Sequence, residues 1–180
     1  MNLHAVVSAI PYIRVFSAAR RHVILCAPTL MLADFAMPCE LSTTPKTIRI
    51  AAAVLMDPQG RTLLVRKRGT QAFMQPGGKI EAHEQPINAL VRELEEELAL
   101  EVDPTSATYL GHFSAPAANE PGFEVQAELF LILTHQAVTP TAEIEEVQWI
   151  DPAGDGGLVL APLTRDVILP FYRNSVRVPA

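Results

Sequence analysis

Cysteine and histidine are too few and too scattered in this chain of 180 residues to build a zinc-type metal site. The two cysteines, Cys26 and Cys39, lie near the N-terminus and provide neither metal-ligand spacing nor a disulfide framework. The five histidines include no pair spaced as in HExxH. These absences exclude a disulfide scaffold and a zinc-peptidase motif, and they favour a reducing, cytoplasmic setting.

Excess positive charge is also absent. The chain has 14 Lys and Arg against 20 Asp and Glu, which gives a formal net charge of −6. Because bulk nucleic-acid binding requires a basic surface, we do not expect this protein to bind long nucleic acids. A small anionic ligand is not excluded, because a bound metal ion can supply positive charge locally.

No apolar run is long enough to span a bilayer. The most apolar stretch near the N-terminus, residues 22–36, is interrupted by Pro28 and Asp34, whereas a transmembrane helix needs about 20 consecutive apolar residues. We therefore expect no membrane partner.

Residues 1–46 differ in composition from the rest of the chain. They contain no acidic residue before Asp34, while three arginines precede it. A secretory signal would carry its basic pair nearer the start, and a transit peptide fits the composition only loosely. We favour a third interpretation, a disordered extension and linker or a start codon assigned too early, with Met31 or Met37 as the true start. The sequence thus predicts one domain over residues 47–180.

Strand and helix patterns are mixed along this domain. Runs rich in Ile, Val and Leu predict strands, and apolar residues at helical spacing after a proline predict the main helix. Residues 76–78, Pro-Gly-Gly, predict a tight turn, and Pro170 is expected to end or kink the last helix. The predicted strands are residues 48–56, 61–67, 109–113, 124–134 and 147–150, and the predicted helices are 86–99 and 162–173. This mixture indicates an α/β sandwich built on a mixed sheet.

Carboxylates gather on one side of the predicted helix 86–99. At about 100° per residue, Glu97 lies about 40° to one side of Glu93, and Glu96 about 60° to the other. Glu95 points away into solvent. Like charges at this spacing repel one another by a few tenths of a kcal/mol per pair, and a divalent cation would remove that repulsion. Oxygen ligands select hard cations, so Mg²⁺ is the expected ion and Mn²⁺ the second choice.

A glutamate-rich helix face alone is most often only a solvated surface, but the residues around this one form a longer pattern. Gly77 and Gly78 allow a backbone carbonyl to approach an ion closely, and Arg92 lies one turn before Glu96, where it can orient a carboxylate. The fixed positions are Gly78, Glu84, Arg92, Glu93, Glu96 and Glu97. Because each residue type occurs at roughly 5–7 per cent, these positions would coincide by chance in about one window in ten million.

This pattern resembles the Nudix box, GX5EX7REUXEEXGU, in which U is a bulky aliphatic residue. The similarity extends over about residues 47–152 and implies a Nudix-type α/β/α sandwich with a mixed β-sheet. Ala99 departs from the box, which has Gly there, and we expect modest local strain at the helix end. Gln85 precedes the helix where Ser or Thr would be a better cap.

The resemblance also implies roles for individual residues. The matching metal ligands are Glu96, Glu97, the carbonyl of Gly77, and Glu93, which in different family members is a ligand or the base. The matching orienting pair, which braces the loop against the helix, is Glu84 and Arg92. A further catalytic glutamate is expected before the last strand, where Glu143 fits best and Glu145 and Glu146 are alternatives. The base is then Glu93 or Glu143, although the segment 143–146 fits a solvated turn equally well.

The implied activity is metal-dependent hydrolysis of the diphosphate linkage of a nucleoside diphosphate joined to another moiety. Candidate substrate-binding residues are Arg66, which lies in a basic run before the box, and Asn119 and Glu120, which lie in the loop 114–122. Two alternatives remain: a Nudix-like module that binds nucleotides without catalysis, and an isopentenyl diphosphate isomerase, which would need a cysteine inside the domain. The sequence leaves open whether the protein forms a homodimer.

Overall fold

The structure is a computed structural model, and it describes residues 46–141 and 143–175. The predictions for residues 1–45, including the start-site and targeting alternatives and both cysteines, lie outside the described residues. No helix within the described ranges is long and apolar enough to cross a membrane.

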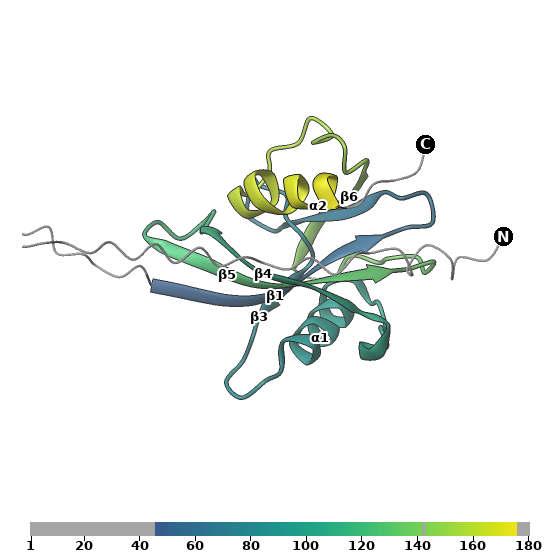
Figure 1. Cartoon of the computed structure of the whole chain (residues 1–180), viewed down its shortest axis with the longest axis horizontal. Helices are drawn as coiled ribbons and strands as arrows, with labels where there is room; N and C mark the ends of the chain where they lie inside the picture. Colours follow the sequence, from purple (N-terminus) through teal and green to yellow (C-terminus); the bar gives the residue numbers. More distant parts are fainter. Residues whose placement is uncertain (1–45, 142, 176–180) are drawn as a thin grey trace, which may run out of the picture. The chain divides into compact units, whose positions relative to one another are not determined.

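A mixed sheet of six strands forms the centre of the domain (Figure 1). The strands are β1 (Lys46–Met56), β2 (Thr62–Lys67), β3 (Gly77–Lys79), β4 (Thr108–Pro116), β5 (Phe123–Leu133) and β6 (Ile144–Ile150). Their order is β4-β5-β1-β2-β6, and β3 pairs with β1. The β1–β5 pair is parallel, and the other pairs are antiparallel. The prediction of a mixed sheet is therefore confirmed.

Helices cover both faces of this sheet (Figure 1). One face carries α1 (Pro86–Leu98), and the other carries η4 (Leu163–Ile168), which has wide π-type turns, and α2 (Leu169–Ser175); a short turn of 3₁₀-helix, η3 (Pro104–Ser106), follows α1. Because side chains alternate along a strand, β1 contributes to both layers. Its Ala51, Ala53 and Leu55 pack beneath α1, and its Ala52, Val54 and Met56 pack toward η4 and α2. The α/β/α sandwich predicted from the resemblance is confirmed.

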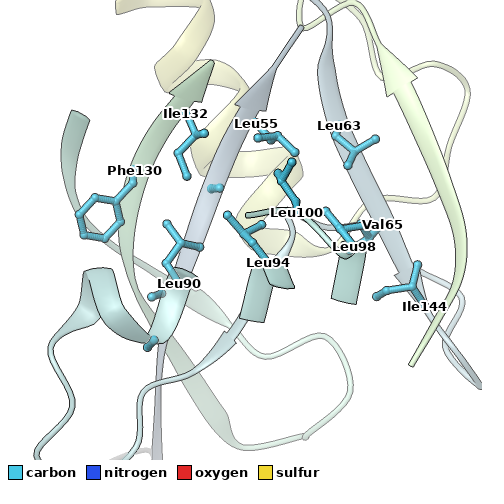
Figure 2. Packing of buried hydrophobic residues seen from close by; sticks show 13 residues of the cluster. Leu55, Leu63, Val65, Leu90, Leu94, Leu98, Leu100, Phe130, Ile132 and Ile144 are labelled. Atoms are coloured by element: carbon cyan, nitrogen blue, oxygen red, sulfur yellow. The ribbon is translucent and has the colours of Figure 1, made fainter. Parts of the chain in front are cut away.

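Leucines fasten α1 to the sheet. Leu90, Leu94 and Leu98 are fully buried, and Figure 2 shows Leu90 on the side of Phe130 and Ile132 and Leu98 beside Val65. Burial of such a side chain contributes about 1.5–3 kcal/mol each. This packing fixes the rotation of α1 and therefore decides where its carboxylates point.

The Pro-Gly-Gly segment differs from the prediction, because it is not a tight turn. Gly77 and Gly78 begin β3, which runs beside Ile50 to Ala52 of β1. Gly77 has a φ of 135°, and a Cβ there would collide with the backbone of Ala51. Only glycine permits this close antiparallel approach of two backbones, so the glycines form a paired strand at the point where the site is built.

The last helix and the last strand also differ from their predicted limits. Helical structure continues through Pro170 to Ser175, so Pro170 does not end it; the irregularity lies before the proline, where the N–H of Leu169 donates to the carbonyl of Thr164 in a π-type turn. β6 begins at Ile144, because its ladder with β2 extends as far as Lys67. Pairing between distant segments therefore set boundaries that local patterns could not.

Candidate active site

The carboxylates of α1 differ sharply in exposure. The side chain of Glu97 is 2% exposed and that of Glu93 13% exposed, whereas that of Glu96 is 61% exposed. Glu95 is exposed on the far side of the helix, as the angular analysis predicted. The three carboxylates of the predicted arc thus run from the sheet surface out to solvent.

Glu97 is a buried carboxylate with incomplete hydrogen bonding. Its Oε2 accepts the backbone N–H of Gly77 at 3.0 Å, and its Oε1 lies 2.7 Å from Nζ of Lys67. The Lys67 contact is an ion pair without hydrogen-bond alignment, so Oε1 is buried and accepts no hydrogen bond. Burial raises the pKa of Glu97, although Lys67 and the Gly77 N–H act to lower it. Lys67 therefore supplies positive charge at Oε1 but no aligned hydrogen bond.

Lys67 lies in the field of several carboxylates. Burial works to lower the pKa of Lys67, but the charge of Glu97, followed by those of Glu93 and Glu143, outweighs that effect and raises it. The ammonium therefore stays protonated at neutral pH. The sequence placed Lys67 in a basic run before the box, but it gave no sign that this residue pairs with Glu97.

Arg92 connects the loop before the helix with two carboxylates of the arc. Its guanidinium donates to both carboxylate oxygens of Glu84 at 3.2 Å, to the Lys79 carbonyl at 3.1 Å, to Glu93 at 2.9 Å and to Glu96 at 3.3 Å. The Arg92 side chain, with help from the N–H of Glu81, holds the pKa of Glu84 below its usual value. The structure thus brings together the residues predicted as an orienting pair.

Gly78 makes room for Glu93. A Cβ at Gly78 would overlap the carboxyl group of Glu93, so only glycine allows this side chain to lie flat against β3. Gly77 lies next to it in β3 and donates its N–H to Glu97. The two glycines and two of the three carboxylates therefore form one compact site between β3 and α1.

The loop between β5 and β6 caps the C-terminal end of α1. The N–H of Thr139 donates to the Leu98 carbonyl at 2.9 Å and that of Thr141 to the Glu97 carbonyl at 3.0 Å, while the Thr141 hydroxyl donates to the Glu96 carbonyl. Helix ends leave such carbonyls without partners. The segment that leads to Glu143 is thereby attached to the backbone of the metal-ligand candidates. The sequence showed no sign of this cap.

Glu143 lies at the sheet edge beside Lys67. Its carbonyl accepts the N–H of Arg68 at 2.8 Å, and its charge contributes to the raised pKa of Lys67. The alternatives Glu145 and Glu146 instead pair with Arg66 at 2.7 and 2.9 Å. A register irregularity between Arg66 and Lys67 places both of these glutamates opposite Arg66.

The residues predicted to contact substrate lie apart from the carboxylates. Arg66 is occupied by its two glutamate partners and by the carbonyl of Thr70. Asn119 and Glu120 lie exposed in the turn between β4 and β5. That turn lies at the end of the sheet where Lys46 faces Phe123. Lys46 is five residues along β1 from Ala51, which is the partner of Gly78 in β3. At about 3.3 Å per residue, this end of the sheet is roughly 17 Å from Gly78.

The donor set fits a hard divalent cation. It consists of carboxylate and carbonyl oxygens and includes the buried Oε1 of Glu97, which accepts no hydrogen bond. It lies beside Gly77 and Gly78, where a Cβ would collide with neighbouring atoms. Within residues 46–141 and 143–175, no three acidic, histidine or cysteine side chains converge in metal-binding geometry. Each carboxylate of the arc is instead held by a basic side chain, Glu97 by Lys67 and the other two by Arg92.

Comparison with known sequences agrees with this architecture. The family model described as the NUDIX domain matches residues 46–154. An 8-oxo-dGTP diphosphatase from Haemophilus influenzae is 41% identical over 59 residues, which are 31% of this chain and 43% of that protein. An RNA pyrophosphohydrolase from Halorhodospira halophila is 40% identical over 58 residues, which are 32% of this chain and 31% of that protein. The match therefore spans less than half the length of either relative.

Comparison with solved structures concerns the fold. The crystal structure of a MutT protein from Methanosarcina mazei Go1 superposes with a TM-score of 0.62 and 21% identity, covering 76% of this chain and 100% of the other. Likeness at this identity shows a shared fold and no more. Because the family model spans more than half of the chain and coincides with the observed sandwich, the chain belongs to the Nudix family.

Proposed function

We propose that this protein is a Mg²⁺-dependent hydrolase that cleaves the diphosphate linkage of a nucleoside diphosphate joined to another moiety. One observation carries the proposal. Glu93, Glu96 and Glu97 lie on one side of α1, and Glu93 and Glu97 lie against the backbone of β3. Glu97 also has a buried oxygen without a hydrogen bond. Such an arrangement is costly in a merely structural helix, because a buried carboxylate requires full compensation.

The residues that would hold the ion are Glu93, Glu96, Glu97 and the carbonyl of Gly77. When bound, a divalent ion would neutralise the diphosphate and lower the pKa of a water molecule. Mn²⁺ is the second candidate, because it prefers similar oxygen ligands. Arg92 fixes the orientation of Glu93 and Glu96, and Glu84 fixes Arg92 in turn. These contacts support the orienting role that we propose for the pair.

Two carboxylates are candidates for the group that accepts a proton from the attacking water. Glu93 lies against Gly78, and Glu143 lies across the site near Lys67. A general base must come within hydrogen-bond reach of the water that it deprotonates. The comparison of Glu93→Gln with Glu143→Gln tests the assignment: the base variant should lower kcat without weakening metal binding, whereas a ligand variant should weaken both.

The proposed substrate class follows from the site and from the relatives. Their names describe a diphosphatase of 8-oxo-dGTP and a pyrophosphohydrolase of RNA. We propose that the carboxylate site binds the phosphate chain of the substrate whatever group that chain carries. We propose that Asn119 and Glu120 contact the distal group of a long substrate, and that Arg66 contacts phosphate after exchanging one of its glutamate partners. We also propose that the protein acts in the cytoplasm; the possibility of a homodimer is to be tested by light scattering.

A binding module without catalysis is the alternative, and the residues present argue against it. Such modules typically lose box carboxylates, whereas this chain retains Glu93, Glu96 and Glu97. An isomerase is disfavoured because the described domain contains no cysteine: both cysteines of the chain precede Thr47. The site therefore supports hydrolysis best.

The deciding experiment is a hydrolysis panel with a matched pair of variants. Wild-type protein with Mg²⁺ should release phosphate-containing products from at least one of nucleoside triphosphates, dinucleoside polyphosphates, ADP-ribose, NADH and nucleotide sugars. Glu97→Gln should lower the rate by orders of magnitude. Its Tm should be lower, because the Lys67 ammonium loses its carboxylate partner, so a circular-dichroism check that the variant is folded accompanies the assay.

Glu95→Gln is the control, because it removes the same charge from an exposed position of the same helix. It should retain the wild-type rate. Binding of nucleotides without turnover across the panel would favour the module, and a wild-type rate in Glu97→Gln would overturn the metal-ligand assignment.

A further inference from the structure

The ammonium of Lys67 contacts Glu97, the most buried carboxylate of the site, at the oxygen where a metal ion would bind. The chain has only three lysines, Lys46, Lys67 and Lys79. The Lys67 ammonium lies 2.7 Å from Oε1 of Glu97, the oxygen that accepts no hydrogen bond. Two other basic side chains near the site, Arg66 and Arg92, are each held by several hydrogen bonds.

The chemistry of this contact differs from that of the arginine contacts. An ammonium is a compact point charge on a flexible stem, whereas a guanidinium binds carboxylates through a rigid fork. Lys67 makes one unaligned contact, and its side chain is 29% exposed, so the ammonium has a route to solvent. Lys67 is therefore easier to displace than Arg66 or Arg92.

The Glu97 carboxylate can also bind a cation of higher charge than an ammonium. The Glu97 side chain is only 2% exposed, and it contacts a single ammonium at Oε1 and a single backbone N–H at Oε2. A divalent ion coordinated to the same oxygen would supply twice the charge at a shorter distance.

We propose that Lys67 is a resident counter-ion that holds Glu97 ready and is exchanged for the divalent metal ion when the metal binds. This inference rests on the proposed function, because it assumes that Glu97 is a metal ligand. Exchange keeps the buried carboxylate compensated in both states. The displaced ammonium remains at the rim of the site beside Glu143, where an incoming phosphate chain would pass.

A purely structural role for Lys67 makes a different prediction. If the ammonium only compensated the buried charge of Glu97, it would stay in place when metal binds, and its accessibility would not change. Metal and ammonium would then not compete for Oε1. The state of the Lys67 amine with and without metal therefore separates the two roles without any measurement of activity.

The first test is acylation of lysine amines, followed by peptide mass spectrometry, with and without saturating Mg²⁺. The exposed Lys46 is an internal reference at the far end of β1. Exchange predicts that Mg²⁺ raises the labelling rate of Lys67 by roughly fivefold or more, the low end of typical coupling between two ligands, and leaves Lys46 unchanged. An unchanged or lower rate at Lys67 overturns the proposal.

The second test measures Mg²⁺ affinity by calorimetry at mildly alkaline pH, where the carboxylates are ionised. Lys67→Met removes the competitor and should bind Mg²⁺ about tenfold more tightly. Lys67→Arg introduces a forked partner that is harder to displace and should bind more weakly than wild type. Lys46→Met is the matched control and should bind as wild type. Equal affinities in both Lys67 variants and wild type contradict exchange.

Glu97→Gln separates the failure of this inference from failure of the proposed function. If wild type binds Mg²⁺ and Glu97→Gln does not, the metal site stands, and the Lys67 results decide exchange alone. If Glu97→Gln binds as wild type, the metal site itself is wrong and exchange falls with it. Should Lys67→Met fail to fold, the labelling test and Lys67→Arg still give the answer.

Discussion

Ala99 holds a backbone conformation that favours glycine. It ends α1 with φ 50° and ψ 38°, and its N–H donates to the Glu95 carbonyl. A residue with a Cβ in this left-handed region costs about 1–2 kcal/mol. Alanine offsets part of that cost, because the unfolded chain loses less backbone entropy on folding with alanine than with glycine at this position. The strain expected because Ala99 replaces the glycine of the Nudix box is thus located in the backbone of Ala99.

Substitution Ala99→Gly should therefore stabilise the protein. We expect a gain of about 0.5–1 kcal/mol, or roughly 1–4 °C in Tm, with kcat unchanged, because Ala99 follows the carboxylates without contacting them. Ala153→Gly is the control, since Ala153 is an exposed turn residue outside the left-handed region. It should leave Tm unchanged or lower. A fall in Tm for Ala99→Gly contradicts the assigned strain.

The Glu84–Arg92 pair predicts a specific dependence of stability on pH. Because Arg92 lowers the folded-state pKa of Glu84 below its ordinary value of 4.5, the pair stabilises the fold above that pH. The contribution is lost as the pH falls through the lowered pKa. Thermal melts of wild type and Glu84→Gln should therefore differ at neutral pH and converge in acid. A difference that persists or grows in acid contradicts this linkage.

Periodicity predicted the arc of carboxylates but not their partners. A helical projection correctly predicted that Glu95 is exposed, because rotation by a fixed angle depends on local sequence alone. Glu96 is exposed as well, and it is the contacts of Arg92 that connect Glu96 with Glu93. The projection could not show that Glu97 is buried and forms an ion pair with Lys67, because that contact joins the helix to a strand residue 30 positions earlier in the chain. The roles of the arc residues stay predictions until the variants are measured.

At the scale of elements, the C-terminal end of α1 depends on Thr139–Thr141. We expect Thr141→Val, which removes the hydroxyl bound to the Glu96 carbonyl, to cost about 1 kcal/mol and to lower kcat, because Glu143 follows in the same segment. Hydrogen exchange should accelerate in the last turn of α1. Thr139→Val is the control, because Thr139 is exposed and uses only its backbone N–H. Equal effects of both variants would assign the loss to β-propensity.

The main elements were predictable because their signals are local. α1 shows apolar spacing and begins at Pro86, and its Gln85 makes no side-chain cap, as expected. β3 escaped prediction because Gly77 and Gly78 carry the signal of a turn, and their strand character comes only from pairing with β1. The domain boundary at residue 47 remains a prediction, with the family match beginning at residue 46.

At the scale of the whole molecule, metal binding should stabilise the fold. A ligand present at about 100 times its Kd and specific for the folded state adds roughly 2.7 kcal/mol, or about 5–11 °C in Tm for a protein of this size. Mg²⁺ should therefore raise the Tm of wild type, and chelation should reverse the rise. Glu97→Gln should show little of this shift. A rise of equal size in that variant would place the ion elsewhere.

The parallel pairing of β1 with β5 has a consequence for how the protein is made. β1 completes its pairing only when Phe123–Leu133 has been synthesised, so the chain must first close a long loop that contains α1, and such closures slow folding. The helix with the proposed metal ligands leaves the ribosome before the strand that completes its sheet and before the threonines that cap its end. A nascent chain that stalls before β5 would expose the unpaired edge of its central strand to aggregation.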